Sequence, residues 1–273
     1  MSTESAVTAW TARADRAEEL RERYPFASQV LTLYLALLPV QEEAYRTTPS
    51  PEELVPWAGA NVLPAVVDAT VAAGPPALRE AVRTRDERAE ALTAWLADAE
   101  LDAVDGYLAR ATLGPALEAL GERAAEVCAP SEGAVATCPH CGGLPQLSVL
   151  VDSGETLVTG RRELLCSRCA WRWDFTRNAC PSCGEEDDDK LLVYTERWGG
   201  PVSSQKSGNG GSPAVFPSLR IAGCATCRRY LIDVDLAREG RAVPEVDELA
   251  AVPLDLYAAD RELTKVTPNL MGF

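Results

Sequence analysis

The stretch at residues 160–184, GRRELLCSRCAWRWDFTRNACPSCG, decides the architecture of the C-terminal half of the chain. It contains two CxxC pairs separated by an alternating segment. In that segment Trp171, Trp173 and Phe175 alternate with polar residues, which predicts a short strand with one apolar face. Cysteine turns joined by short strands are typical of small metal-stabilised modules.

Eight of the nine cysteines fall into four CxxC pairs, and only Cys128 stands alone. In a reducing compartment such pairs indicate metal ligands, and redox-active disulfides are the alternative interpretation. A tetrahedral site needs two CxxC turns, so the chain is expected to hold two metal ions, iron or zinc, each bound by four cysteines. The predicted metal ligands are Cys138, Cys141, Cys166, Cys169, Cys180, Cys183, Cys224 and Cys227.

The first and third pairs have a distinctive form, CPHCG and CPSCG. Gly142 and Gly184 suit a backbone position with positive φ, which lets main-chain N–H groups point at the sulfurs. Each of these pairs precedes strands and a plainer CxxC pair followed by an aromatic strand. This repeat favours tandem pairing, first with second and third with fourth. A cross-braced pairing, first with third and second with fourth, is the alternative.

The N-terminal half differs in composition, because alanine, leucine, glutamate and arginine dominate it and favour helices. Apolar residues recur at helical spacing, for example at Val104, Tyr107, Leu108 and Ala111. A proline- and glycine-containing linker at 129–133 ends this half. We expect helices over 5–23, 26–45, 51–58, 62–73, 89–99 and 104–111.

Residues 131–273 contain more β-branched and aromatic residues and more turn signals. A loop rich in glycine and serine is expected at 197–216, and it is expected to be mobile. Strands are expected over 146–151, 161–165, 171–176, 191–196, 218–222 and 230–234, and a helical tail over 246–263.

The net charge of −15 argues against binding of nucleic acid or an anionic membrane surface. Five arginines make residues 131–183 locally neutral, which gives nucleic-acid binding little support. The apolar run at 30–40 is shorter than the roughly 20 residues of a spanning helix. The N-terminal MSTESAVTAW lacks the pattern of a secretory signal, so a cytoplasmic protein without a membrane span is expected.

No catalytic residues are expected. His140 is the single histidine and lies inside the first CxxC pair, with its side chain expected to point away from the metal. Four thiolates on each ion leave no open position for hydrolytic chemistry. Cys128 is expected to be a structural residue at a helix end, and the acidic run at 184–190 a solvated turn without calcium-site spacing. The chain is therefore predicted not to be an enzyme.

Four segments resemble the formate dehydrogenase accessory proteins of the FdhE family: CPHCGGLPQLSVL from 138, the stretch 160–184, GCATCRRYLIDVD from 223, and the terminal PNLMGF. The resemblance covers about 137–273. It implies a helical domain followed by two rubredoxin-like metal modules, and it implies the eight paired cysteines as ligands. It further implies a non-catalytic cytoplasmic factor that acts on the catalytic subunit of formate dehydrogenase before export.

The sequence thus predicts an α+β protein with an N-terminal α-helical domain, two tandem rubredoxin-like, zinc-ribbon-type modules and a C-terminal helical tail. The expected bounds are 1–130, 131–179, 180–245 and 246–273. The predicted function is maturation of formate dehydrogenase through binding of its catalytic subunit. A rubredoxin-like electron-transfer partner is the alternative, and a zinc-ribbon nucleic-acid regulator is a third class. Monomer and homodimer both stay open.

Overall fold

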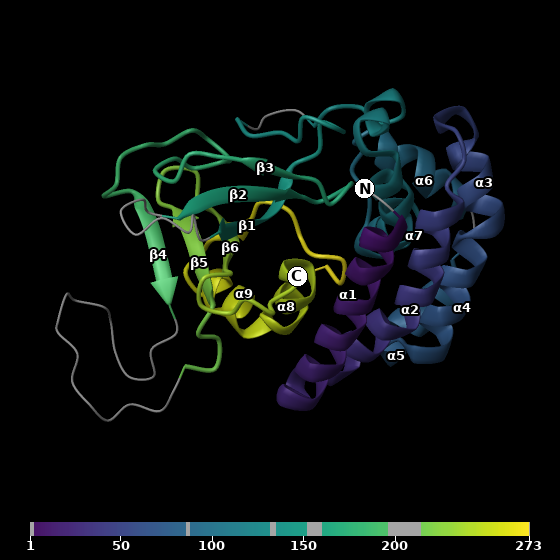
Figure 1. Cartoon of the computed structure of the whole chain (residues 1–273), viewed down its shortest axis with the longest axis horizontal. Helices are drawn as coiled ribbons and strands as arrows, with labels where there is room; N and C mark the ends of the chain where they lie inside the picture. Colours follow the sequence, from purple (N-terminus) through teal and green to yellow (C-terminus); the bar gives the residue numbers. More distant parts are fainter. Residues whose placement is uncertain (1–2, 86–87, 132–134, 152–159, 196–213, 273) are drawn as a thin grey trace.

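The computed structural model describes residues 3–85, 88–131, 135–151, 160–195 and 214–272. Helices form one end of the molecule, and a sheet carrying two further helices forms the other (Figure 1). The predicted α+β architecture with two cysteine sites in the sheet region is confirmed. The loop predicted at 197–216 falls largely outside the described residues, as does the centre of the linker at 132–134.

The helical end follows the predicted periodicity closely. Its short connections use 3₁₀ turns at Pro25–Ala27, Pro51–Glu53 and Gly121–Glu126. Asp102 caps the last long helix, because its side chain accepts hydrogen bonds from the N–H groups of Val104 and Asp105. The helices are α1 (Thr3–Arg23), α2 (Ser28–Thr47), α3 (Leu54–Asn61), α4 (Leu63–Ala73), α5 (Pro76–Arg83), α6 (Arg88–Leu96) and α7 (Ala103–Leu120).

One helix was not predicted, and two predicted elements differ from those observed. The short α5 begins at Pro76, and proline is a favourable first helical residue, but apolar periodicity alone does not predict this helix. The aromatic strand contains only Arg172–Asp174, and Trp171 before it is 44% exposed. The helical tail is two helices, α8 (Pro244–Ala250) and α9 (Val252–Ala259), and Leu256 of α9 is 59% exposed.

A single sheet joins the strands of both predicted metal modules. Among the described residues it has seven strands, in the order β3-β2-β1-β6-β5-β4, and β7 pairs with β6. Neighbouring strands are antiparallel, except that β1 and β7 run parallel to β6. The strands are β1 (Pro145–Val151), β2 (Arg161–Cys166), β3 (Arg172–Asp174), β4 (Leu191–Thr195), β5 (Leu219–Cys224), β6 (Arg229–Asp235) and β7 (Thr264–Lys265).

The parallel pairing of β1 with β6 links residues near the first CxxC pair to residues after the fourth. Leu147 lies opposite Ile232, and Val149 lies opposite Val234. These four side chains are fully buried in one core with α1, α2, α8 and α9. The division at 131–179 and 180–245 stays a prediction, and the two segments share this sheet and core.

The helical end has a second core of its own. Leu37 of α2, Leu92 of α6 and Leu108 and Leu117 of α7 are fully buried there. Cys138, Cys141, Cys166 and Cys169 belong to the same cluster. The two CxxC turns that carry these cysteines, which we call knuckles, are therefore packed against the helices and do not form a separate core.

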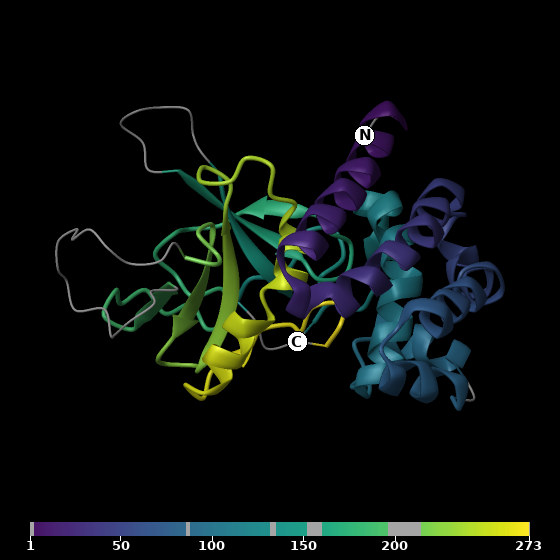
Figure 2. The same ribbon diagram turned by 90° about the horizontal axis from the view of Figure 1, so that it is seen from below.

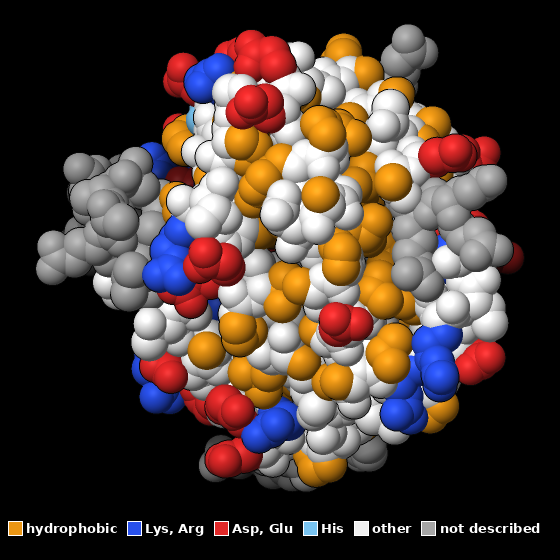
Figure 3. Space-filling model, turned by 90° about the vertical axis from the view of Figure 1, so that its right-hand side faces the viewer, with side chains coloured by type: hydrophobic (Ala, Val, Ile, Leu, Met, Phe, Trp, Pro, Cys, Tyr) orange, Lys and Arg blue, Asp and Glu red, His pale blue; other side chains and the backbone are white. Residues whose placement is uncertain are grey.

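One apolar stretch of the helical end is longer than the run at 30–40. Pro51–Ala73 is 23 residues long with a mean hydropathy of 1.3, which by length and composition would suffice to cross a bilayer. Leu54, Ala58 and Val66 of this stretch are buried in the helical core. The stretch lies at the right-hand end of the molecule in Figure 1. Hydrophobic side chains spread over the middle of this end in Figure 3.

Buried ion pairs fix helix α1 to the C-terminal helix α8. Arg16 binds Asp247 through contacts of 2.5–3.2 Å, and each side chain is 4% exposed. Arg13 is shared between Glu118 of α7 and Glu245 of α8. Arg13 thus connects the helical end with the helices that cover the sheet.

Breaking the Arg16–Asp247 pair should destabilise the fold strongly. Arg16→Ala leaves Asp247 buried and unpaired, which should lower the free energy of unfolding by about 3–5 kcal/mol. Arg21→Ala removes an exposed pair with Glu18, and should cost about 0.5 kcal/mol or less. Urea denaturation measures both. Similar small losses in the two variants would contradict the structural role of the buried pair.

Candidate metal centres

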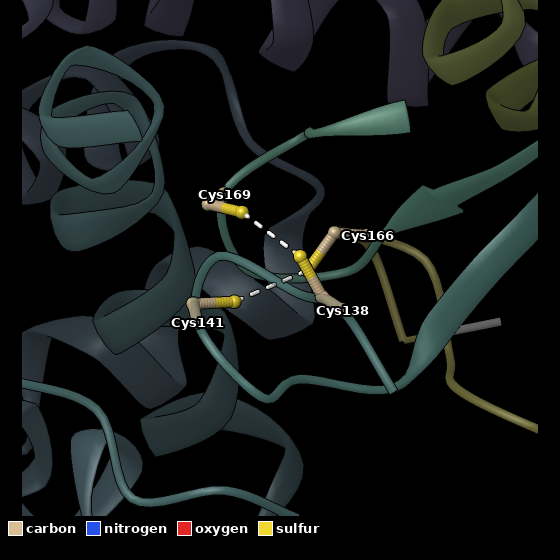
Figure 4. A group of neighbouring side chains, drawn as sticks. All are labelled: Cys138, Cys141, Cys166 and Cys169. Atoms are coloured by element: carbon tan, nitrogen blue, oxygen red, sulfur yellow. Dashed lines mark hydrogen bonds between the residues drawn. The ribbon is translucent and has the colours of Figure 1, made fainter. Parts of the chain in front are cut away.

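The four CxxC turns come together in two groups. Cys138, Cys141, Cys166 and Cys169 form the first centre (Figure 4), and Cys180, Cys183, Cys224 and Cys227 form the second. Within each group all four sulfurs lie within 4.8 Å of one another. The structure therefore has the tandem pairing and not the cross-braced one.

The sulfur separations distinguish metal ligation from disulfide bonding. In the first centre the Cys138–Cys169 and Cys141–Cys166 sulfurs are 3.6 and 3.3 Å apart. In the second centre both cross-turn separations are 3.7 Å. A tetrahedron with Zn–S bonds of about 2.3 Å has sulfur–sulfur edges of about 3.8 Å, whereas a disulfide bond is about 2.05 Å. The two groups fit two tetrahedral ions, and the geometry alone does not select zinc or iron.

All four knuckles use the same backbone turn. Gly142 and Gly184 have φ of 70° and 77°, as their sequence position predicts. The plainer knuckles reach the same region with Ala170 and Arg228, whose φ values are 53° and 59°. A positive φ strains residues with a side chain. Because these two positions lack glycine, the sequence does not predict their positive φ.

Main-chain donors point at the sulfurs. The N–H of Arg168 donates to the sulfur of Cys166 at 3.3 Å. In the second centre the N–H groups of Ser182 and Cys183 point at the sulfur of Cys180. Such donors stabilise thiolates, which are the form that binds a metal.

Burial opposes the thiolate form where no cation is bound. It raises the pKa of the Cys180 thiol despite the N–H donors, and it raises the pKa of the Cys166 thiol well above its usual value. Four buried thiolates so close together would repel one another. A divalent ion removes both penalties, so metal uptake should release protons.

The two centres differ in their surroundings. All four cysteines of the first centre are buried, and they pack in the helical core. In the second centre Cys183 is exposed and Cys227 is half-buried. The second centre is thus the more accessible of the two.

Arg168, inside the second knuckle, ties the first centre to the helical end. Its guanidinium donates to the carbonyl oxygen of Ala129 at 2.7 Å and to the carboxylate of Asp98. The linker after α7 and the turn after α6 are thereby held against the knuckle. In the sequence Arg168 is only one of several basic residues, and nothing in its spacing indicates this role.

The acidic run at 184–190 has a similar but smaller role at the second centre. It is an exposed turn, yet Glu185 accepts a hydrogen bond from Thr226 at 2.5 Å and contacts Lys190 at 3.3 Å. The hydrogen bond from Thr226, followed by that from the N–H of Asp187, lowers the pKa of Glu185 to about 2. Because Thr226 lies inside the fourth CxxC pair, this contact joins the third knuckle to the fourth.

His140 is buried against Trp171, with stacked rings whose centroids are 3.9 Å apart. It belongs to neither sulfur group.

Cys128 lies beside the first centre, which its expected place at a helix end does not indicate. A hydrogen bond with Cys141, followed by burial, raises the pKa of the Cys128 thiol. A neutral thiol can thus donate to a ligand sulfur, a role that its isolated position in the sequence does not indicate.

Comparison with known proteins connects these centres to one family. Residues 137–177 match a family model described as "FdhE, central domain". An FdhE homolog from Aquifex aeolicus is 32% identical over 50% of this chain and 41% of its own length. The aligned segment thus spans about two fifths of that relative. An FdhE homolog from Rhizobium meliloti is 26% identical over 96% of this chain and 89% of its own length.

A solved structure extends the likeness to the whole fold. The crystal structure of the FdhE protein from Pseudomonas aeruginosa superposes with a TM-score of 0.62 at 24% identity. The match covers 96% of this chain and 95% of that one. Helical end, sheet and C-terminal helices are therefore one architecture shared with that protein.

The metal content should change one centre at a time. Wild-type protein purified without oxygen should hold about two equivalents of zinc plus iron, since each ion needs four cysteines. Cys138→Ser with Cys141→Ser should leave about one equivalent, because a centre with two thiolates loses its ion. Cys128→Ser is the matched control and should keep both. Plasma emission spectroscopy measures the content, and two equivalents in the Cys138/Cys141 variant would contradict the assignment.

The loss of the first ion should also reach the helices. The first centre shares a core with α2, α6 and α7, so hydrogen exchange should speed up in these helices in the Cys138/Cys141 variant. The sequence alone, by contrast, predicts that the helical half folds independently of the first metal module. Unchanged hydrogen-exchange protection of α7 in this variant would instead support independent folding of the helical half.

Equivalent turn positions should respond oppositely to substitution. A Cβ atom at Gly142 would lie 2.6 Å from the Cα of Pro130, so Gly142→Ala should cost more than the about 1–2 kcal/mol of a left-handed residue. Ala170→Gly relieves strain and should leave stability nearly unchanged or slightly raised. Thermal unfolding of the metal-loaded variants compares them. A larger loss for Ala170→Gly would refute this account of the turns.

Proposed function

Because this chain is related to the FdhE family, we propose that it is an accessory factor for the maturation of formate dehydrogenase. The relationship runs along nearly the whole chain in sequence and in fold. In this proposal the chain binds the catalytic subunit of the enzyme in the cytoplasm, before that subunit is exported. It does not itself turn over a substrate.

The observation that carries the proposal is the closed ligand set of both centres. Each sulfur group is complete with four cysteines, so an ion bound there has no open position for a substrate or water. We propose that all eight cysteines are ligands. Bound zinc would supply a rigid cross-link, and bound iron would add one-electron chemistry.

In this proposal the chain's own residues hold a partner-binding surface in a fixed position. Arg168 fixes the first centre to α6 and the linker, and Arg13 and Arg16 fix the helical end to α8. The apolar middle of the helical face in Figure 3 is available to a partner. A cavity of about 390 Å3 beside Trp57, Val40 and Ala65 lies at this end. A stiff frame with an apolar face supports binding of a protein client.

One observation favours the alternative of an electron-transfer partner. Cys183 of the second centre is exposed, as a site that exchanges electrons with another protein would require. That function needs iron at the second centre and a reversible change of visible absorbance on reduction. A zinc-loaded protein that still supports maturation would exclude it.

Deletion of the gene in the native cell should lower formate dehydrogenase activity while transcription of the enzyme stays normal. A chain with Cys128→Ser should restore activity, whereas Cys138→Ser with Cys141→Ser should not, because the first centre holds the frame together. Formate oxidation and transcript levels are measured under conditions that induce the enzyme.

The tagged protein should co-purify with the catalytic subunit from the same cells. Normal formate oxidation in the deletion strain would contradict the proposal. Absence of the subunit from the purified complex, together with reduced activity, would contradict direct binding.

A further inference from the structure

The sheet has one face covered by helices and one face that no described helix covers. The C-terminal helices, yellow in Figure 2, lie on the covered side together with α1. Leu147, Ile221 and Ile232 point to that side and are fully buried. We call the opposite side the open face, and it carries the side chains that alternate with these.

Part of the open face is apolar, because Leu164 and Leu231 are buried there in a small cluster, and arginines lie beside that part. Arg220 pairs across the ladder with Asp233, so the two side chains share a face, and Ala222 pairs with Leu231 on the same face. Arg229 lies two residues before Leu231 and points the same way. Asp233 and Leu231 are buried, whereas Arg220 is half-buried and Arg229 is exposed, so solvent or a polar ligand can reach the arginine side of this face.

A cavity of about 80 Å3 opens among these side chains. Its charged lining residues are Arg162, Arg177, Arg220, Arg229 and Asp233. Cys180 of the second centre also lines the cavity, and four thiolates with one divalent ion would sum to −2; together with Asp233 this still leaves the four arginines a net positive charge, in a chain whose net charge is −15. Leu191, Leu192 and Val193 of strand β4 form one apolar wall.

Part of this positive charge is not neutralised within the described part of the chain. Arg162 is used internally, because it donates to the Ser148 hydroxyl and to the carbonyl oxygen of Ala179 and lies 3.9 Å from the Asp233 carboxylate. Arg220 contacts Asp233 only through Nε, at 2.9 Å. Its two terminal nitrogens have no partner among the described residues.

Arg177 and Arg229 have no charged partner among the described residues. Arg177 donates to the carbonyl oxygen of Gly160, which carries no charge. Arg229 is exposed and makes no hydrogen bond or ion pair through its side chain with a described residue. Two guanidinium groups without a charged partner among the described residues fit a site that binds an anion.

We propose that this cavity binds an acidic side chain of a polypeptide segment that lies along strand β4. Guanidinium groups bind carboxylates through paired, charge-assisted hydrogen bonds. The cavity is small enough for one carboxyl group but not for a nucleotide. A long polyanion such as nucleic acid would meet the negative charge of the rest of the surface.

Strand β4 supplies the reason for choosing a polypeptide over a free anion. It is the edge of the sheet among the described residues, so its outer main-chain groups can pair with an added strand. Val193 beside the cavity is 54% exposed and offers an apolar contact. The proposal relies on the proposed function only in expecting a protein partner, and its test does not use formate dehydrogenase.

The test uses an acetylated six-residue peptide with glutamate and valine alternating, and the same peptide with glutamine for comparison. The glutamate peptide should bind the metal-loaded full chain about tenfold more tightly than the glutamine peptide, since carboxylates pair with arginine more strongly than amides do. Calorimetry or fluorescence anisotropy at low salt measures the affinity. Equal binding of the two peptides, or no binding of either, would overturn the proposal.

Arg177→Glu with Arg229→Glu should weaken binding of the glutamate peptide about tenfold or more, because the cavity then repels carboxylate. Arg46→Glu with Arg241→Glu is the matched control, since it makes the same charge change at exposed sites elsewhere. An equal loss in the control would overturn the proposal. So would Arg177- and Arg229-dependent binding of inorganic phosphate or a single-stranded oligonucleotide without binding of the peptide.

Discussion

Eight thiols held at two points are the constraint on which the rest of this structure depends. Each group brings four sulfurs within 4.8 Å of one another. Burial and mutual repulsion make four thiolates unstable there without a cation. The turns, the strands between them and the shared sheet bring these sulfurs together, and a bound metal ion would make the arrangement favourable.

The first centre carries more of the structure than the second. Its cysteines lie in the same core as Leu92 and Leu108 of the helical end, and Arg168 links its knuckle to the linker and to Asp98. The second centre is partly exposed and sits at the edge of the sheet where β4 and the open face lie. One centre thus joins the two ends of the molecule, while the other stands beside the surface proposed for a partner.

The sequence predicted those features that local patterns determine. CxxC spacing indicated both cysteine groups, the repeated order of knuckles indicated tandem pairing, and the family resemblance, carried by 137–273, is confirmed. It did not predict features that depend on tertiary contacts. The positive φ of Ala170 and Arg228 is imposed by the knuckle geometry against residue preference. The parallel pairing of β1 with β6 and the contact of Cys128 with Cys141 join distant or isolated residues that no local period relates.

The ligand sphere of the bound metal tests the central claim most directly. X-ray absorption spectroscopy at the edge of the purified protein's metal should show four sulfur ligands per ion at about 2.3 Å and no nitrogen or oxygen ligand. That result would establish all eight paired cysteines as ligands in two closed sites. A mixed sulfur and nitrogen or oxygen sphere would contradict the closed sites, and metal-free protein with disulfides would contradict metal ligation altogether.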